Sequence, residues 1–280
     1  MSSRLREIAR DNATIVAAGG YRTRSGRQVS LAAALAESRA GTRIYGPNQV
    51  IPDGEPSVRQ HETAVEVTGE SSTVAARRLD GDVAGPVRGA SVAVLNFASA
   101  RNPGGGYVRG AKAQEEALCR ASALYETLLE APEYYEVHRA GSSTFYTDRV
   151  IHSPGVPVFR DDRGELLETP FRVGFLTSPA PNAGTIRRQE PERAAEIPAA
   201  LARRAERVLE TAALHGYPRL VLGAWGCGVF RNDPVEVAEA FRALLAGRFA
   251  GAFERVVFGV LDRDPGPRAA FERAFAGYGA

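Results

Sequence analysis

The stretch from residue 91 to residue 120 constrains the fold more than any other part of the chain. It contains an apolar run over 92–95, a triple glycine at 104–106 and, after seven further residues, Gln114 at the start of an apolar-periodic segment. This order predicts a strand, a glycine loop and a helix. Glycines let a loop adopt positive φ and bring its N–H groups close to a ligand, and a helix start favours an anion. The stretch therefore predicts a phosphate site.

Two adjacent carboxylates, Glu115 and Glu116, follow this loop. Neighbouring residues on a helix point about 100° apart, so the two side chains face a ligand differently. One carboxyl can face the reacting atom while the other binds a hydroxyl or braces the loop. Cleavage of a glycosidic bond needs a protonated carboxyl, because the leaving oxygen must receive a proton from a general acid. The pair indicates this chemistry, although by itself it would more often complement a helix start.

A second glycine stretch, GAWGCGVF, occupies residues 223–230 and directly follows an apolar run. Cys227 stands between two of its glycines, but no Cys-His-Asp arrangement accompanies it. A small side chain in a phosphate loop therefore fits better than a nucleophile. Both glycine loops follow predicted strands, which is the pattern of an open α/β sheet with its ligand site at the strand ends.

The two stretches together resemble the poly(ADP-ribose) glycohydrolases. The first, GGG and QEE with seven residues between them, is similar to the family's signature, and the second is similar to its diphosphate loop. The resemblance spans about residues 86–280 and suggests the compact microbial-type branch. It implies an α/β fold with a macrodomain-like mixed sheet flanked by helices. It also implies hydrolysis of the ribose–ribose O-glycosidic bonds of poly(ADP-ribose), which releases ADP-ribose and reverses ADP-ribosylation.

The same resemblance implies the roles of the site residues. Glu116 would protonate the leaving ribose oxygen and then take a proton from water, while Glu115 would bind ribose hydroxyls. The loops would hold the diphosphate through backbone N–H groups, and no metal or organic cofactor is needed. The expected substrate-binding residues are Asn102, Gly104, Gly105, Gly106, Gln114, Gly226, Cys227, Gly228, Val229, Phe230 and Phe258. For Phe258, a place in the core is an equally good interpretation.

Composition and charge describe an ordinary globular protein. With 280 residues and 44% hydrophobic content, the chain can form one large domain or a domain with an extension. Its net charge of +2 provides no general attraction for nucleic acid or membranes. We expect poly(ADP-ribose), ADP-ribose and poly(ADP-ribosyl)ated proteins as partners. We also expect a monomer with no direct contact with nucleic acid or a membrane.

Cysteine, histidine and hydropathy patterns bear on the location and on metals. The two cysteines form no disulfide framework, and the four histidines lack the paired spacing of a metal site. Charges occur throughout the start of the chain, and no apolar run is long enough to cross a membrane. We therefore expect a cytoplasmic protein without metal catalysis.

The predicted elements divide the chain into two parts. Residues 1–85 are expected to form an accessory extension, mostly helix and loop, packed on the core, and residues 86–280 the catalytic domain. The boundary falls in the Asp-, Gly- and Pro-rich stretch that ends at residue 86. Strands are predicted over 63–68, 91–95, 149–153, 171–176, 219–223 and 256–260. Helices are predicted over 5–9, 74–79, 114–130 and 190–215, and further helices are predicted to begin at 30, 132, 234 and 267. Hairpin turns are predicted within 21–28 and at 161–164.

Two other functions are compatible with these motifs. A non-catalytic ADP-ribose-binding macrodomain would share the glycine loops, but it has no need for adjacent glutamates. An enzyme that removes single ADP-ribose units from proteins is not excluded by the sequence, although the resemblance favours the polymer. Whether cleavage occurs only at the ends of the polymer or also within it depends on how residues 1–85 and the hairpin near residue 160 enclose the site.

Overall fold

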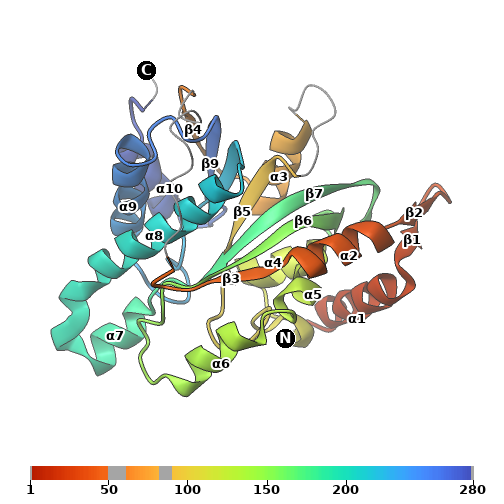
Figure 1. The fold of residues 1–280 in the computed structure, drawn as a ribbon, viewed down its shortest axis with the longest axis horizontal. Coiled ribbons are helices and arrows are strands. Elements are labelled where there is room, and N and C mark those ends of the chain that lie inside the picture. Colours follow the sequence, from red (N-terminus) through yellow and green to blue (C-terminus); the bar gives the residue numbers. More distant parts are fainter. Residues whose placement is uncertain (1, 50–60, 82–89, 279–280) are drawn as a thin grey trace.

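A mixed α/β fold places a central sheet between two layers of helices (Figure 1). The computed structural model describes residues 2–49, 61–81 and 90–278. Within these ranges the main sheet has the strand order β3-β6-β7-β5-β8-β9-β4. The strands are β3 (Arg43–Tyr45), β4 (Ala64–Thr68), β5 (Val92–Phe97), β6 (Val150–Arg160), β7 (Leu166–Ser178), β8 (Arg219–Leu222) and β9 (Arg255–Gly259).

Most strands of this sheet run in the same direction. β5 pairs in parallel with both β7 and β8, and β9 pairs in parallel with β8 and β4. Among the described strands, β6 alone runs in the opposite direction, so it pairs antiparallel with both β7 and β3. The carboxyl ends of β5, β8 and β9 therefore meet at one edge, from which both glycine loops begin.

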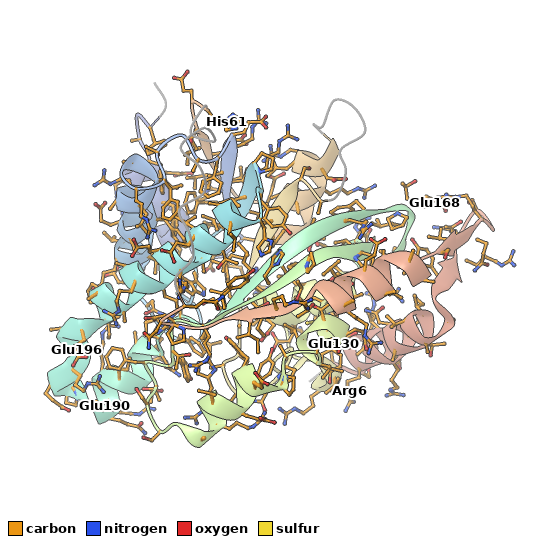
Figure 2. All side chains as sticks on the ribbon, in the orientation of Figure 1. Arg6, His61, Glu130, Glu168, Glu190 and Glu196 are labelled. Carbon is orange, nitrogen blue, oxygen red and sulfur yellow. The ribbon has the colours of Figure 1, made fainter. Side chains whose placement is uncertain are left out.

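The apolar side chains of β5 pack into two hydrophobic clusters, one on each face of the sheet. Val92 and Val94 belong to the cluster on one face of the sheet, while Ala93 and Leu95 belong to the cluster on the other. A strand alternates its side chains between faces, so a continuous apolar run is what a centrally buried strand requires. Side chains fill the space between sheet and helices on both sides (Figure 2).

Each face has its own set of helices. The first cluster takes residues from α1 (Ser3–Ala18), α2 (Ala32–Gly41), α3 (Ser72–Gly81), α4 (Gln114–Ala121), α5 (Leu124–Leu128) and α6 (Pro132–Ala140). The second cluster takes residues from α7 (Ala183–Gln189), α8 (Ile197–Leu214), α9 (Pro234–Ala246) and α10 (Pro265–Ala274). The remaining elements are a hairpin of β1 (Gly20–Arg22) and β2 (Gln28–Ser30), and the 3-10 helices η2 (Tyr107–Arg109) and η3 (Pro191–Glu196). None of the helices in the described part of the chain has the length and hydropathy needed to span a lipid bilayer.

The helix predicted over 114–130 is divided into α4 and α5. Ser122 leaves the helical conformation with φ −141° and forms a bridge with Val158 of β6. Its hydroxyl donates to the Leu118 carbonyl at 2.7 Å and accepts the Leu124 N–H at 3.2 Å. The side chain thus caps both helices, and a tertiary contact with the sheet overrides the helical periodicity.

Strand β6 continues beyond its predicted end at Pro154. The pairing with β7 shifts register between Ser153 and Val156, and Gly155 lies in this irregularity with φ 55°. A proline is tolerated where the ladder is interrupted, because its missing N–H leaves no broken hydrogen bond there. The hairpin predicted around 161–164 is confirmed, and its strands are longer than predicted.

Both outer strands of the main sheet come from the first 85 residues. The strand predicted over 63–68 is confirmed as β4, whereas β3 was not predicted. β4 pairs with β9 and β3 pairs with β6. The division into an accessory extension and a catalytic domain stays a prediction, but the two segments share one sheet.

Phe258 lies in the core, which corrects the expectation that it contacts substrate. Its side chain is fully buried in β9. The ring centroid lies 4.6 Å from that of Phe275 and 5.2 Å from that of Phe271. The strand directs Phe258 toward the helices of the second face, so the alternative interpretation as a core residue is the one that the structure supports.

We expect Phe258→Ala to lower the free energy of unfolding by about 3–5 kcal/mol, because it removes buried contacts and leaves a cavity. Urea denaturation measures this value. Val229→Ala is a matched control, since the Val229 side chain is 81% exposed, and it should change the stability by less than about 0.5 kcal/mol. Equal losses for the two variants would contradict the core position of Phe258.

Candidate active site

A cleft of about 1250 Å³ lies along the carboxyl ends of β5, β8 and β9 and reaches the first turns of α1. It brings together most of the residues that the sequence motifs indicated. Those that line it are Asn102, Gly105, Gly106, Gln114, Glu115, Glu116, Gly226, Cys227, Gly228, Val229 and Phe230. Gly104 packs against Tyr125 and Cys119 instead, and Phe258 lies in the core, so neither lines the cleft.

The first glycine loop fits closely against the two carboxyl groups. Gly104 and Gly105 have φ values of 63° and 57°, which favour glycine. A Cβ atom on Gly105 would lie 2.6 Å from Glu116 Oε1 and 3.0 Å from Glu115 Oε2. The position therefore requires glycine both for its backbone conformation and for the space that the carboxyl groups occupy.

The Glu115 carboxyl is buried and hydrogen-bonded at both oxygens. Oε2 accepts the Ser99 N–H at 2.7 Å, and Oε1 accepts a hydrogen from Asn96 Nδ2 at 3.2 Å. Burial raises the pKa of Glu115 to about 8, and these hydrogen bonds oppose the rise only in part. Near neutral pH, this carboxyl therefore carries less negative charge than an exposed glutamate.

The Glu116 carboxyl has one oxygen held and one without a partner. Oε1 accepts the Gly106 N–H at 2.8 Å. Oε2 is buried and has no hydrogen-bond partner among the described residues. Buried polar atoms in proteins are nearly always satisfied, so an unpaired carboxyl oxygen in a cleft indicates a place for a ligand group. Of the two carboxyl groups, Glu116 is the one with an oxygen that has no hydrogen-bond partner among the described residues.

Gln114 fixes the start of α4 to the end of β5. Its Oε1 accepts the Phe97 N–H at 2.9 Å, and its Nε2 donates to the Leu95 carbonyl at 2.8 Å. Nε2 also donates to Ser72 Oγ at 3.0 Å. Because the amide is satisfied within the protein, Gln114 orients the two glutamates that follow it.

Hydrogen bonds from the side chains of Asn232 and Trp225 hold the second glycine loop in place. Gly226 has φ 72°, and a Cβ atom there would lie 2.5 Å from Asn232 Nδ2. The buried Asn232 amide donates to the carbonyls of Pro181 at 2.9 Å and Gly226 at 3.2 Å. Trp225 Nε1 donates to the Ser178 carbonyl at 3.1 Å. These bonds hold the loop in place and leave its next residues facing the cleft.

Backbone N–H groups of the second loop remain available for a ligand. Within the described residues, the N–H groups of Gly228, Val229 and Phe230 donate to no protein acceptor. Successive N–H groups of this kind form a concave site for an anion. In the first loop, by contrast, the N–H groups of Gly105 and Gly106 bind Asn102 O and Glu116. The N–H groups of Gly105 and Gly106 therefore support the protein, whereas those of the second loop can bind a ligand.

Sequence reasoning missed three residues of the site. Asn96 donates a hydrogen bond to Glu115. Its position as a polar residue at the end of an apolar run could have indicated it. Asn232 anchors the second loop, and only its short distance from that loop in the sequence indicated it. Tyr146 lines the cleft with φ 59° and a ring centroid 5.9 Å from that of Phe230. No local pattern marks Tyr146, because its place depends on tertiary packing.

Cys227 lines the cleft within the second glycine loop. Burial raises the pKa of the Cys227 thiol to about 12, so it is not a thiolate near neutral pH. Among residues 2–49, 61–81 and 90–278, no three His, Cys, Asp or Glu side chains form a group that could hold a metal ion.

Comparisons with known proteins identify relatives along nearly the whole chain. The family model "Microbial-type PARG, catalytic domain", where PARG is poly(ADP-ribose) glycohydrolase, matches residues 9–161. PARG from Thermomonospora curvata bound to the inhibitor ADP-HPD is 47% identical, with a TM-score of 0.88 over 98% of this chain and 100% of that one. PARG from Deinococcus radiodurans in complex with ADP-ribose is 47% identical, with a TM-score of 0.78 over 87% of this chain and 97% of that one. The comparison with curated proteins gave no match.

We expect the raised pKa of Glu115 to make stability fall with rising pH. Between the ordinary pKa of 4.5 and about 8, the folded state keeps a proton that the unfolded state has released. Raising the pH through this range therefore favours unfolding. Glu115→Gln cannot titrate and should lose this part of the pH dependence.

Urea denaturation at several pH values measures this effect as the difference between the wild type and the variant. Taking the difference removes the contributions of histidines, which both proteins share. Glu133→Gln, at an exposed position on α6, is the matched control and should follow the wild type. Parallel stability curves for Glu115→Gln and the wild type would contradict the assignment.

Proposed function

The chain belongs to the microbial-type PARG catalytic domain family, and from this premise we propose that it hydrolyses poly(ADP-ribose). The bond broken is the ribose–ribose O-glycosidic bond, and free ADP-ribose is released. The observation that carries the proposal is the Glu116 carboxyl, which lies in the cleft with Oε1 bound to Gly106 and Oε2 unpaired.

The second glycine loop binds the diphosphate of the unit to be released. The available N–H groups of Gly228, Val229 and Phe230 support this role, since they can donate to phosphate oxygens. The first loop shapes the pocket around the terminal ribose, because its N–H groups already serve the protein. Glu115 contacts ribose hydroxyls, and its raised pKa limits repulsion between this carboxyl and the bound diphosphate.

Glu116 carries out the proton transfers. It donates a proton to the leaving ribose oxygen as the bond from that oxygen to the anomeric carbon breaks. The positive charge that develops on the sugar is stabilised by the nearby diphosphate. A water molecule then attacks the anomeric carbon, and Glu116 takes its proton. The cycle returns the carboxyl to its protonated form.

Two alternative functions lack support of this kind. A non-catalytic ADP-ribose reader needs the N–H groups of the second loop but has no use for an unpaired carboxyl oxygen. An enzyme limited to single protein-linked units needs no cleft beyond one ADP-ribose. A macrodomain-type ADP-ribose site, a cytoplasmic location, a monomeric state and poly(ADP-ribosyl)ated proteins as partners are parts of the proposal that rest on the sequence.

The first test is the release of ADP-ribose from purified poly(ADP-ribose) in the presence of EDTA. We expect rapid release, because the scheme uses only side chains and backbone groups of this chain. Binding of ADP-ribose without any release would favour the reader function over the enzyme.

We expect Glu116→Gln to lower kcat by about 10²–10⁴, the usual contribution of general acid–base catalysis. The dissociation constant for ADP-ribose should change little, because the second loop is intact. Steady-state kinetics on poly(ADP-ribose) and calorimetry with ADP-ribose measure the two effects separately. Glu133→Gln is again the matched control, and near-normal turnover of Glu116→Gln would exclude Glu116 as the general acid.

A further inference from the structure

One part of the cleft is lined by α1, by the segment that follows the first glycine loop and by the turn between β6 and β7, which contact one another. Four cationic side chains line this part, which we call the basic arm: Arg4, Arg109, Lys112 and Arg163. Arg120 also lines the cleft, but its guanidinium donates to the Ala111 carbonyl at 2.6 Å. The other lining residues of the basic arm come from α1 and from the turn between β6 and β7. The whole cleft, at about 1250 Å³, exceeds the roughly 300–1,000 Å³ of ordinary small-ligand pockets. The cleft therefore has room for more than one unit of the polymer.

The order of residues along the cleft places the glutamates between the second loop and the basic arm. Glu115 lies on the side of the second loop, because it binds Asn96 and Ser99 at the end of β5. The neighbouring Phe97 ring is in turn 3.0 Å from a Cβ position on Gly223, where that loop begins. Glu116 lies on the other side and binds Gly106, from which the chain continues directly to Arg109 and Lys112.

The far wall of the basic arm is held by contacts of α1. Arg4 Nη2 donates to the Arg163 carbonyl at 2.7 Å, and a Cβ atom on Gly164 would lie 2.7 Å from Ile8 Cδ1. Gly110 has φ 79° and fits so closely that its Cβ would lie 2.8 Å from the Ser2 carbonyl oxygen. Helix α1 thus joins the hairpin turn to the segment that carries Arg109 and Lys112.

Arg109 and Lys112 are exposed cations without a protein partner. Within the described part of the chain, neither side chain forms a hydrogen bond or an ion pair. The acidic residues that also line the arm, Asp161, Asp162 and Glu165, belong to the hairpin turn on the far wall. Asp161 Oδ1 accepts two N–H groups of that turn. Arg109 and Lys112 are therefore free to attract an anion.

We propose that the basic arm binds the diphosphate of the adjoining ADP-ribose unit, the one on the leaving side of the bond that is cut. This inference rests on the proposed function. The second loop holds the released unit, so the leaving ribose departs past Glu116 toward Arg109 and Lys112. That ribose carries its own diphosphate, which is an anion of the kind that these cations bind. The arm thereby favours polymer over a single unit linked to protein.

The test measures binding to a variant that is expected to turn over its ligand only slowly. In the Glu116→Gln background, a two-unit ADP-ribose oligomer should bind more tightly than ADP-ribose. Adding Arg109→Ala and Lys112→Ala should raise the dissociation constant of the two-unit oligomer by about tenfold, as expected for two solvent-accessible ion pairs. The affinity for ADP-ribose should change by less than about twofold. The difference should shrink at high salt, because salt screens such pairs.

Two further pairs of variants separate charge from structure. Arg109→Gln with Lys112→Gln keeps polar side chains and removes the charges, and it should weaken binding of the oligomer equally. Arg24→Ala with Arg188→Ala removes two exposed arginines that do not line the cleft and should change neither affinity. In Figure 2, Glu190, two residues after Arg188, lies well apart from Arg6 of α1, the helix that walls the arm. Thermal unfolding checks that all variants are folded.

The outcomes distinguish the arm from the proposed function. Equal affinity of the Glu116→Gln protein for the two-unit oligomer and for ADP-ribose would overturn the inference, and so would an equal loss of both affinities on substituting Arg109 and Lys112. If the wild type released no ADP-ribose although the oligomer preference depended on the arm, the proposed function would fail. Binding of a second ADP-ribose unit by the arm would then stand, without a leaving side.

Discussion

Burial of two neighbouring carboxyl groups at the start of α4 is the constraint on which the rest of the site depends. Buried carboxyl groups are costly unless donors satisfy them, and here the donors are Asn96 and the N–H groups of Ser99 and Gly106. Those donors keep their positions only if α4 stays fixed to β5, which the Gln114 amide ensures. The loop comes close enough because Gly105 has no Cβ. The positions of the first glycine loop, the start of α4 and the central strand β5 therefore depend on one another.

The two glycine loops resemble each other in sequence but are organised differently. The first directs its N–H groups inward, where they support the protein and Glu116. The second relies on Asn232 and Trp225 for support, which leaves the N–H groups of Gly228 to Phe230 for a ligand. Glycine content alone could not separate these roles, because it reports backbone freedom and not the partner of each N–H group.

The sequence predicted the fold class and the central part of the site because their signals are local. The strand–loop–helix order around residues 104–116 follows from a period of apolar residues and from glycines. The failures concern contacts between distant segments: Ser122 ends α4 because it meets β6, and Phe258 turns inward because α10 covers its face of β9. The basic arm was not predicted for the same reason. Its far wall consists of the hairpin turn and α1, and no local pattern encodes the contact between them.

The pairing of β4 with β9 has a consequence for how the protein is made. Ala64 pairs with Arg255, so a strand from near the beginning of the chain finds its partner only when the last strand has been synthesised. Closing so long a loop is slow, since its entropy must be lost before the contact is gained. During translation the exposed edge of β4 must wait while the centre of the sheet assembles. The central strands can pack early, whereas the complete sheet forms only after β9 has been synthesised.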